Sequence, residues 1–315
     1  MKLVKAVSPY IYPNGINFKH KPYEAWVRCG GQVAKAHYPA RPFHKLAFLF
    51  ELPTLWRNKK EARLRFVQPV SIKFDTFPDY CFYEIIPFVW DCWPRFFELT
   101  CNWLQNHKVE TALFTSSQTA ERMKERFPQM NILFVPEGIG ATEYCEGKPL
   151  NQRTNHLYEI GRGKRCFLKS QYPKEYERLS SLPADGLIPD KESYIEELCN
   201  AQVTVTFPRC DLMPEETGDI ETLTQRYWEA MLTRSVIVGR APKELIDLIG
   251  YNPVIDLNKK NPIEHIEDIL GHIEDYQPLV DRNRQTALEK GCWKQRMKDV
   301  IQWLTSIGYV CTNNG

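Results

Sequence analysis

The chain reads Asp219-Ile-Glu-Thr-Leu-Thr-Gln-Arg-Tyr-Trp-Glu-Ala-Met-Leu232 in the stretch that decides its fold. An apolar run at 203–207 and a polar loop precede this stretch, and a second apolar run at 235–239 follows it. Strand, loop, helix and strand in this order predict a βαβ unit of a parallel sheet. Eight residues of helix span about 12 Å, so two helical glutamates could not easily share one small ligand. Glu221 and Glu229 can face one ligand if the first lies in the loop before the helix and the second lies within it.

The N-terminal end of this helix would offer backbone N–H groups without helical partners, and such ends attract anions. Thr222 and Thr224 are candidate caps for it and candidate ligands of a bound molecule. An extended ligand with phosphates in its middle and hydroxyl groups at both ends fits this arrangement. The alternative is an ordinary amphipathic helix with two solvated carboxylates.

The Glu-x7-Glu spacing of Glu221 and Glu229 resembles the donor-site motif of retaining glycosyltransferases of the two-domain GT-B type. The flanks agree, because 193–208 is similar to the family's helix and strand before the motif and 236–254 resembles its strand, short helix and loop after it. The resemblance implies that Glu221 lies near the donor sugar and that Glu229 binds the ribose of the nucleotide. The family usually has glycines between the two glutamates, where this chain has threonines.

A basic turn, Gly161-Arg-Gly-Lys-Arg165, follows a predicted strand at 156–160. In the resembling family, a Gly-Arg pair after this strand and a lysine shortly beyond it bind the donor diphosphate. Arg162 is the direct match, and a guanidinium can pair with two phosphate oxygens. Lys164, Arg165 and Lys169 are all candidates for the lysine, and the alternative is a basic turn on the surface.

Residues 80–135 alternate between apolar strands and amphipathic helices, one of which begins at Pro94. The strands are predicted at 80–90, 111–115 and 132–135. This alternation is typical of a Rossmann-like half. Asp91 ends the first strand, at the edge where open parallel sheets bind ligands, and is the candidate residue on the acceptor side. The alternative is a local cap before the Pro94 helix.

A length of 315 residues suggests two domains of roughly 150 residues each. We expect an acceptor-side Rossmann-like domain at 1–148 and a nucleotide-sugar donor domain at 149–315. The predicted fold class is therefore α/β, with two Rossmann-like domains facing a cleft. The resemblance implies that the final helix, predicted at 293–307, crosses back onto the first domain.

The formal net charge is only +2, which gives no indication of a nucleic-acid partner. The ten cysteines are scattered singly without a Cys-x-x-Cys pair, which predicts reduced thiols in a cytoplasmic protein rather than disulfides or a zinc site. We expect neither a signal peptide nor a transmembrane helix, since no run approaches the ~20 apolar residues of a membrane span.

Residues 55–66 combine five basic side chains with apolar ones. A basic amphipathic stretch can lie on an anionic membrane surface, so the segment between Trp56 and Arg65 is a candidate for peripheral contact with the inner membrane face. The alternative is a solvated helix face.

The chain contains no Asp-x-Asp, the metal site of the other glycosyltransferase architecture, and Asp219-Ile-Glu221 is the nearest approach. Arg162, a nearby lysine and the N–H groups at Thr222 to Thr224 can stabilise a leaving diphosphate without a metal. For the resembling family, front-face attack with retention is the usual account, and the leaving phosphate takes the proton of the acceptor.

The resemblance, together with these patterns, implies a glycosyltransferase without a cofactor. It would move a sugar from a nucleotide-diphosphate donor to a glycan or lipid-linked acceptor in surface-polysaccharide biosynthesis. One alternative is a nucleotide-sugar epimerase on the same fold, which would need no acceptor. Another is a non-catalytic protein that binds the nucleotide sugar and performs neither hydrolysis nor transfer.

Overall fold

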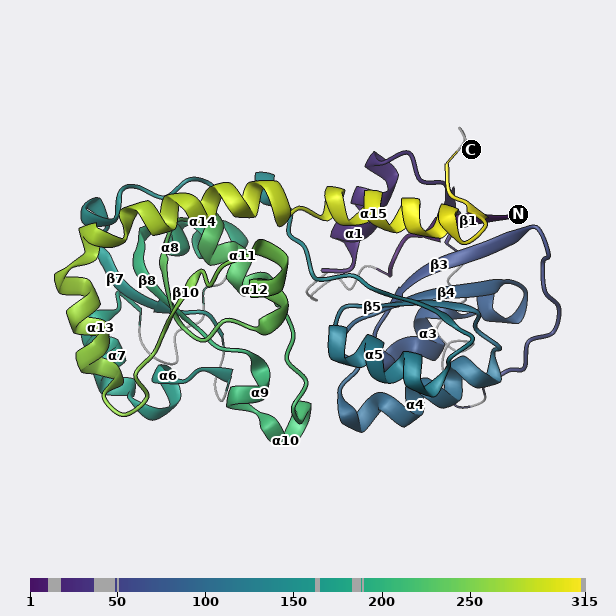
Figure 1. Ribbon diagram of the computed structural model, residues 1–315, viewed down its shortest axis with the longest axis horizontal. Helices are drawn as coiled ribbons and strands as arrows, with labels where there is room; N and C mark the ends of the chain where they lie inside the picture. The colour runs from purple at the N-terminus through teal and green to yellow at the C-terminus, as the bar shows by residue number, and fades with distance from the viewer. Residues whose placement is uncertain are drawn as a thin grey trace. The chain divides into compact units, whose positions relative to one another are not determined.

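The structure is a computed structural model that describes residues 1–10, 18–36, 49, 51–161, 165–182, 188 and 190–312. It divides into two compact units, one of Met1–Pro136 with Trp293–Gly315 and one of Glu137–Cys292 (Figure 1). The chain thus enters the second unit well before the expected boundary at residue 148. The reason lies in two hydrogen bonds within that unit, from Trp228 Nε1 to Glu137 O and from Ile139 N to Gly291 O, both 2.8 Å.

Within the described residues, the first unit holds a seven-stranded sheet in the order β11-β1-β3-β4-β5-β6, with β2 beside β1. All of these strands pair in parallel. The strands are β1 (Lys2–Val7), β2 (Val33–Ala34), β3 (Glu61–Val67), β4 (Glu84–Val89), β5 (Thr111–Phe114), β6 (Asn131–Phe134) and β11 (Tyr309–Val310). The helices are α1 (His20–Arg28), α3 (Ile72–Thr76), α4 (Pro94–Asn106), α5 (Ser117–Arg126) and α15 (Trp293–Ser306), with short 3-10 turns η1 (Pro69–Ser71) and η2 (Asp79–Cys81).

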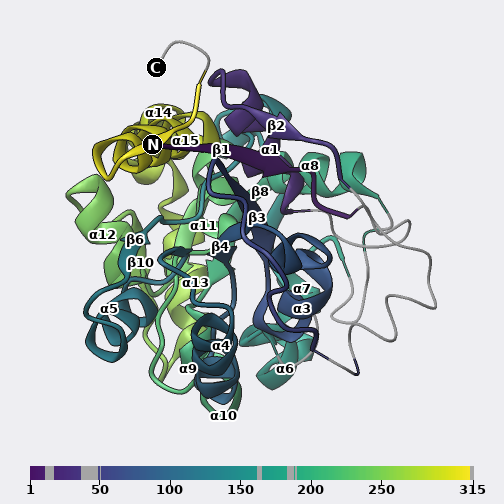
Figure 2. The same ribbon diagram turned by 90° about the vertical axis from the view of Figure 1, so that its right-hand side faces the viewer.

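Helices cover both faces of this sheet, as a parallel sheet requires. Alternate residues of β4 show the two sides: Ile86 and Phe88 pack with α1 and α15, whereas Ile85 and Val89 pack with α3, α4 and α5. Figure 2 shows α1 and α15 on one side of the strands and α3, α4 and α5 on the other.

The C-terminal segment is fixed to the first unit by buried polar contacts. The hydroxyl of Tyr309 in β11 donates to the buried carboxylate of Glu84 and lies 3.0 Å from Thr111 Oγ1. Strand β11 pairs with β1. The expectation that the last helix returns to the first domain is therefore confirmed.

The second unit has, in its described part, a four-stranded parallel sheet in the order β10-β9-β8-β7. Its strands are β7 (Asn155–Glu159), β8 (Ala201–Thr206), β9 (Val236–Gly239) and β10 (Val254–Asp256). Its helices are α6 (Leu168–Gln171), α7 (Pro173–Leu179), α8 (Lys191–Asn200), α9 (Arg209–Leu212), α10 (Pro214–Thr217), α11 (Gln225–Leu232), α12 (Lys243–Ile249), α13 (Pro262–Gly271) and α14 (Gln277–Lys290). Short 3-10 turns are η3 (Ala141–Glu143), η4 (Leu150–Gln152) and η6 (Ile273–Tyr276).

Strand β9 shows how this second sheet is buried. Val236 and Val238 pack with residues of α6, α7 and α13, while Ile237 packs with residues of α8, α11, α12 and α14. The two helix sets lie on opposite sides of the sheet in Figure 1. The βαβ unit predicted around the two glutamates is present as β8, α11 and β9.

The basic stretch at 55–66 is not one amphipathic helix. Its second half is the inner strand β3, in which Arg63 and Arg65 are buried. Arg65 Nη2 lies 2.7 Å from the Asp79 carboxylate, and Arg63 lies over the ring of Tyr83. The prediction that this whole segment faces a membrane is therefore wrong, because two of its five basic side chains are buried in the sheet. No helix in the described ranges is both long enough and apolar enough to cross a bilayer.

Candidate functional site

The two glutamates of the central motif lie on one loop-helix segment of the second unit. Helix α11 begins at Gln225, so Glu221 lies in the preceding loop and Glu229 lies within the helix. The segment follows β8, whose carboxyl end lies at the sheet edge where open parallel sheets bind ligands. This is the arrangement in which both carboxylates can face one extended ligand.

The carboxylate of Glu221 is held on both oxygens. Oε1 accepts from Arg240 Nη1, and Oε2 accepts from the backbone N–H of Lys243 at 2.7 Å. Lys243 is the first residue of α12, so the carboxylate of Glu221 also neutralises the positive end of that short helix.

Arg240 connects Glu221 with a second carboxylate. Its Nε and Nη2 donate to Asp211 over 2.8 and 2.5 Å, a bidentate pair. Burial would raise the pKa of Asp211, but the guanidinium lowers it below its usual value. Lys259 Nζ lies 3.5 Å from the same carboxylate and 5.1 Å from the ring centre of Phe207. Three charged groups from separate segments, the helix α9 and the loops after β9 and β10, therefore converge near Glu221.

Arg240 is a residue that the sequence reasoning missed. It directly follows the apolar run at 235–239, and the carboxyl end of a predicted parallel strand is a place to look for functional side chains. The position of Arg240 after this run could therefore have identified it as a candidate site residue.

The N-terminal end of α11 differs from the expectation. Thr224 occupies the cap position with extended backbone angles, yet its hydroxyl makes no cap hydrogen bond and has no partner among the described residues. Thr222 is buried. The backbone N–H of Leu223 donates instead to Glu244 Oε2 at 2.8 Å. Thr224 therefore holds the cap position, but the prediction that its side chain caps the helix is wrong, because its hydroxyl accepts from no N–H of the first turn.

The carboxylate of Glu229 accepts hydrogen bonds from two tyrosines. Tyr144 donates to Oε1 at 2.7 Å and Tyr194 donates to Oε2 at 2.6 Å. Burial and the negative charge of Glu229 raise the pKa of both phenols, so they remain protonated donors. Neither tyrosine was singled out from the sequence, and the position of Tyr144 in a connecting segment gave no signal.

Two of the predicted diphosphate-binding residues, Arg162 and Lys164, lie outside the described residues. Arg165 is exposed, whereas Lys169 in α6 is buried. The ammonium of Lys169 lies 5.1 and 5.2 Å from the ring centres of Tyr158 and Tyr176. Burial lowers the pKa of Lys169. A cation held between aromatic rings in this way has lost part of its hydration and can bind an anion strongly.

The N-terminal end of α6 is occupied by the protein itself. The buried carboxylate of Glu159, the last residue of β7, accepts from the N–H groups of Phe167, Leu168 and Lys169 over 2.5, 3.2 and 2.8 Å. Burial raises the pKa of Glu159, and these three hydrogen bonds oppose that shift. An incoming phosphate would therefore meet the side chain of Lys169 rather than free N–H groups of this turn.

Asp91 belongs to the first unit. It follows β4 and adopts a positive φ of 53°, an uncommon conformation for a residue other than glycine. Its carboxylate accepts from Gln68 Nε2 at 2.8 Å. Asp91 lies two residues beyond the strand, and the N-cap position of α4 is held by Trp93 rather than by Asp91.

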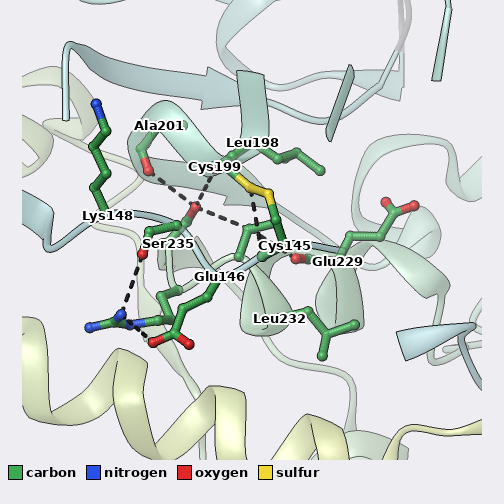
Figure 3. Close-up of a disulfide and its surroundings, with 12 residues drawn as sticks. Cys145, Glu146, Lys148, Leu198, Cys199, Ala201, Glu229, Leu232 and Ser235 are labelled. Carbon is green, nitrogen blue, oxygen red and sulfur yellow. Dashed lines mark hydrogen bonds and ion pairs between the residues drawn. A yellow bond between two sulfur atoms is a disulfide. The ribbon is translucent and has the colours of Figure 1, made fainter. Parts of the chain in front are cut away.

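The cysteines are not all free. Cys145 and Cys199, 54 positions apart in sequence, form a disulfide in the second unit, which Figure 3 draws together with Glu229. The prediction of reduced thiols throughout is wrong at this pair. Sequence spacing does not reveal such a bond, because only the fold brings the two residues together.

No protein-family model and no curated protein sequence matches this chain. Solved structures do match. Sucrose-phosphate synthase from Thermosynechococcus elongatus superposes with a TM-score of 0.60 at 11% identity, over 98% of this chain and 99% of that one. A glycosyltransferase involved in avilamycin A biosynthesis gives 0.53 at 11% identity, over 98% of both chains. A glycosyltransferase from Rickettsia africae gives 0.53 at 9% identity, over 97% of this chain and 98% of that one.

The chain has the GT-B fold. The expected α/β class is thereby confirmed over nearly the whole length of the protein. At these identities the likeness establishes the architecture alone, since unrelated functions can share one fold. The activity of this GT-B protein has to be argued from its own residues.

Proposed function

We propose that this GT-B protein is a glycosyltransferase. It moves a sugar from a nucleotide-diphosphate donor to a glycan or lipid-linked acceptor, with retention and without a metal, in surface-polysaccharide biosynthesis. The single observation that carries the proposal is the placement of Glu221 and Glu229, one in the loop and one in the helix that follow β8. Two carboxylates in those positions suit a ligand with hydroxyl groups at both ends.

Glu229 is the proposed ligand of the ribose. An ionised carboxylate offers about four acceptor positions, and the two tyrosines occupy two of them. The positions that remain can accept the 2′- and 3′-hydroxyl groups of a ribose. Two hydrogen bonds from the protein fix the carboxylate in advance, which lowers the cost of ordering it on binding.

The diphosphate is assigned to Lys169 together with Arg162. Among Arg165 and Lys169, the two lysine-position candidates within the described residues, the burial of Lys169 and its two aromatic neighbours favour Lys169. Arg162 stays a proposal from the sequence pattern, as do Lys164, Thr222 and Thr224.

In the proposed reaction, the bond between the anomeric carbon and the diphosphate oxygen breaks and a bond from that carbon to the acceptor oxygen forms. The acceptor hydroxyl gives its proton to the leaving diphosphate. Lys169 and Arg162 stabilise the negative charge that develops on that oxygen. Glu221, held in place by Arg240, lies at the sugar end, and Asp91 is proposed to help position the acceptor.

A panel of nucleotides and nucleotide sugars tests this proposal. A donor or its nucleoside diphosphate should raise the melting temperature, and more so the more tightly it binds, and Glu229→Gln should reduce that shift. The protein and the stabilising donor are then incubated with and without glycan acceptors, and products are followed by mass spectrometry. A glycosylated acceptor supports the proposal.

Other outcomes have defined meanings. Conversion of the donor to an isomer without any acceptor would indicate an epimerase. Tight nucleotide binding without hydrolysis or transfer would indicate a non-catalytic binding protein. No stabilisation by any nucleotide or nucleotide sugar would contradict the proposal as a whole.

A further inference from the structure

The two tyrosines that bind Glu229 come from separate segments of the second unit. Tyr144 follows the turn η3 in the segment before β7, whereas Tyr194 lies in helix α8. Glu229 itself lies in α11. The orientation of the Glu229 carboxylate therefore depends on how the η3 segment and α8 are held relative to each other.

A disulfide bond joins these two segments. Cys145 is the residue after Tyr144, and Cys199 is near the end of the helix that carries Tyr194. Figure 3 shows this disulfide in the same close-up as Glu229. Cys145 is exposed and Cys199 is buried.

The η3 segment, residues 141–146, also packs into the core of this unit, because Ala141 and Tyr144 share a buried cluster with Leu198 of α8. Its other side-chain contacts include ion pairs near the surface. Glu146 pairs with Arg234 at 2.6 Å and Arg284 at 3.5 Å, and its own side chain is more than half exposed. Glu143 pairs with Lys191 at the start of α8. Exposed pairs of this kind contribute little to rigidity in water. The disulfide adds a covalent constraint on the separation of Tyr144 and Tyr194, which neither this packing nor the ion pairs provide.

We propose that Tyr144 and Tyr194 are positioning residues for Glu229, and that the Cys145–Cys199 disulfide makes nucleotide binding sensitive to thiol reductants. The inference rests on the proposed function, because it takes Glu229 as the ribose ligand. With the bond formed, both phenols are held where they donate to the carboxylate. With the bond broken, the η3 segment can move away, and Glu229 loses the partner that Tyr144 provides.

The chemistry needs only a dithiol. A thiolate of the reductant attacks one sulfur of the disulfide and forms a mixed disulfide, and the other protein sulfur leaves as a thiolate and takes up a proton. The second thiol of the reductant then displaces the remaining protein thiol. The protein gains two electrons and two protons, and the dithiol becomes a cyclic disulfide. In a reducing compartment such bonds form transiently, which suits a redox-responsive role better than a purely structural one.

The test compares the full-length protein in its oxidised form and after dithiothreitol treatment. The probes are UDP, GDP, ADP and dTDP, and the dissociation constant is measured by calorimetry for the one that binds most tightly. Thiol counting by alkylation and mass spectrometry verifies the redox state of Cys145 and Cys199. Hydrogen exchange over the η3 segment and α8 gives a readout that does not depend on any ligand.

We expect reduction to weaken binding roughly tenfold, the effect of losing one hydrogen bond to a charged group. The Cys145→Ser/Cys199→Ser variant should bind like the reduced protein and ignore dithiothreitol. In Tyr144→Phe, reduction should cause no further loss, because the affected hydrogen bond is already absent. Cys29→Ser, which changes a free cysteine of the other unit, should keep the full response.

The inference is overturned if the oxidised protein binds a nucleoside diphosphate and reduction leaves both the affinity and the hydrogen exchange unchanged. Alkylation of Cys145 and Cys199 in protein kept under oxidising conditions would also overturn it, since the bond would then not form. Absence of binding in both redox states would contradict the proposed function, whereas redox-independent binding would contradict only this inference.

Discussion

Arg240 donates two hydrogen bonds to Asp211, over 2.8 and 2.5 Å, and a third to Glu221. One guanidinium thus fixes the carboxylate that we assign to the sugar end of the donor. Its planar fork suits this role, because a lysine at the same place could not bind Asp211 bidentately.

Replacing Arg240 should therefore loosen Glu221. In Arg240→Gln, Glu221 and Asp211 lose the cation closest to them, and we expect a stability loss of about 1–3 kcal/mol and a lower turnover with the intact donor. Arg240→Lys should recover part of both, since it restores the charge without the fork. Melting temperature and initial transfer rates measure the two effects.

A neighbouring residue provides the control. Lys243 donates its backbone N–H to Glu221, and its side chain is 78% exposed and pairs with Asp247. Lys243→Ala should change stability by no more than about 0.5 kcal/mol, as is usual at the surface. If Arg240→Gln behaves like this control, Glu221 does not depend on Arg240.

Lys169 gives a prediction about pH. Burial lowers its pKa, so it loses its proton at a lower pH than an exposed lysine does. A neutral lysine no longer attracts a diphosphate, so the affinity for a nucleoside diphosphate should fall as the pH rises. This fall should begin at a lower pH than the one at which an ordinary lysine loses its proton. In Lys169→Arg, which stays protonated, the decline should move to higher pH.

Calorimetric titrations across the alkaline range check this pH dependence. Lys174→Arg, a change of an exposed lysine in the neighbouring helix α7, should reproduce the wild-type profile. Identical profiles for wild type and Lys169→Arg would exclude Lys169 as the residue that binds the diphosphate.

Removal of divalent metals should leave activity intact. In the proposed site, side-chain cations neutralise the negative charge of the leaving diphosphate. The sequence has no Asp-x-Asp, the motif of a metal site. Transfer rates measured with and without excess EDTA should agree. Complete loss of transfer, restored by Mn²⁺ or Mg²⁺, would reverse this part of the proposal.

Membrane contact stays a prediction for the part of the basic stretch that precedes β3. Leu55 and Trp56 are 64% and 63% exposed, and their N–H groups pair with Cys81 O. Lys59 and Lys60 next to them are exposed. Since each lysine near an anionic surface contributes about 1 kcal/mol, Lys59→Glu/Lys60→Glu should reduce cosedimentation with phosphatidylserine vesicles. Lys124→Glu on α5 is the matched control. If the wild-type protein stays in the supernatant, the prediction of membrane contact is wrong.

Local patterns were sufficient to predict most of the elements. The apolar run at 235–239 and the proline at the start of α4 each specify an element through neighbouring residues. The position of Glu221 before α11 follows from the same kind of pattern. Such signals depend on a few adjacent residues, so no tertiary structure is needed to use them.

Contacts between distant segments could not be predicted in this way. Tyr144 is 85 positions from Glu229, and Cys145 is 54 positions from Cys199, so no spacing rule links them. Arg63 and Arg65 were assigned to a surface because they are charged, but partners from elsewhere in the chain allow them to lie in an inner strand. Burial of a charge depends on its partner, and the partner is known only from the fold.

The central claim is that Glu221 and Glu229 contact different ends of one nucleotide sugar. If Glu229 binds the ribose, Glu229→Gln removes a charge-assisted interaction of roughly 1.5–3 kcal/mol, on the order of tenfold to a hundredfold in affinity. The loss should appear with the free nucleoside diphosphate as well as with the intact donor. Glu221→Gln should leave the nucleoside diphosphate affinity nearly unchanged and lower turnover of the donor.

The most direct measurement is calorimetry of both variants with the nucleoside diphosphate and with the intact donor, with Glu216→Gln in the preceding helix α10 as the control. The account predicts weaker binding of both ligands by Glu229→Gln, unchanged nucleoside diphosphate binding by Glu221→Gln, and wild-type behaviour of Glu216→Gln. Equal and negligible changes, within about 0.5 kcal/mol for all three variants, would contradict it.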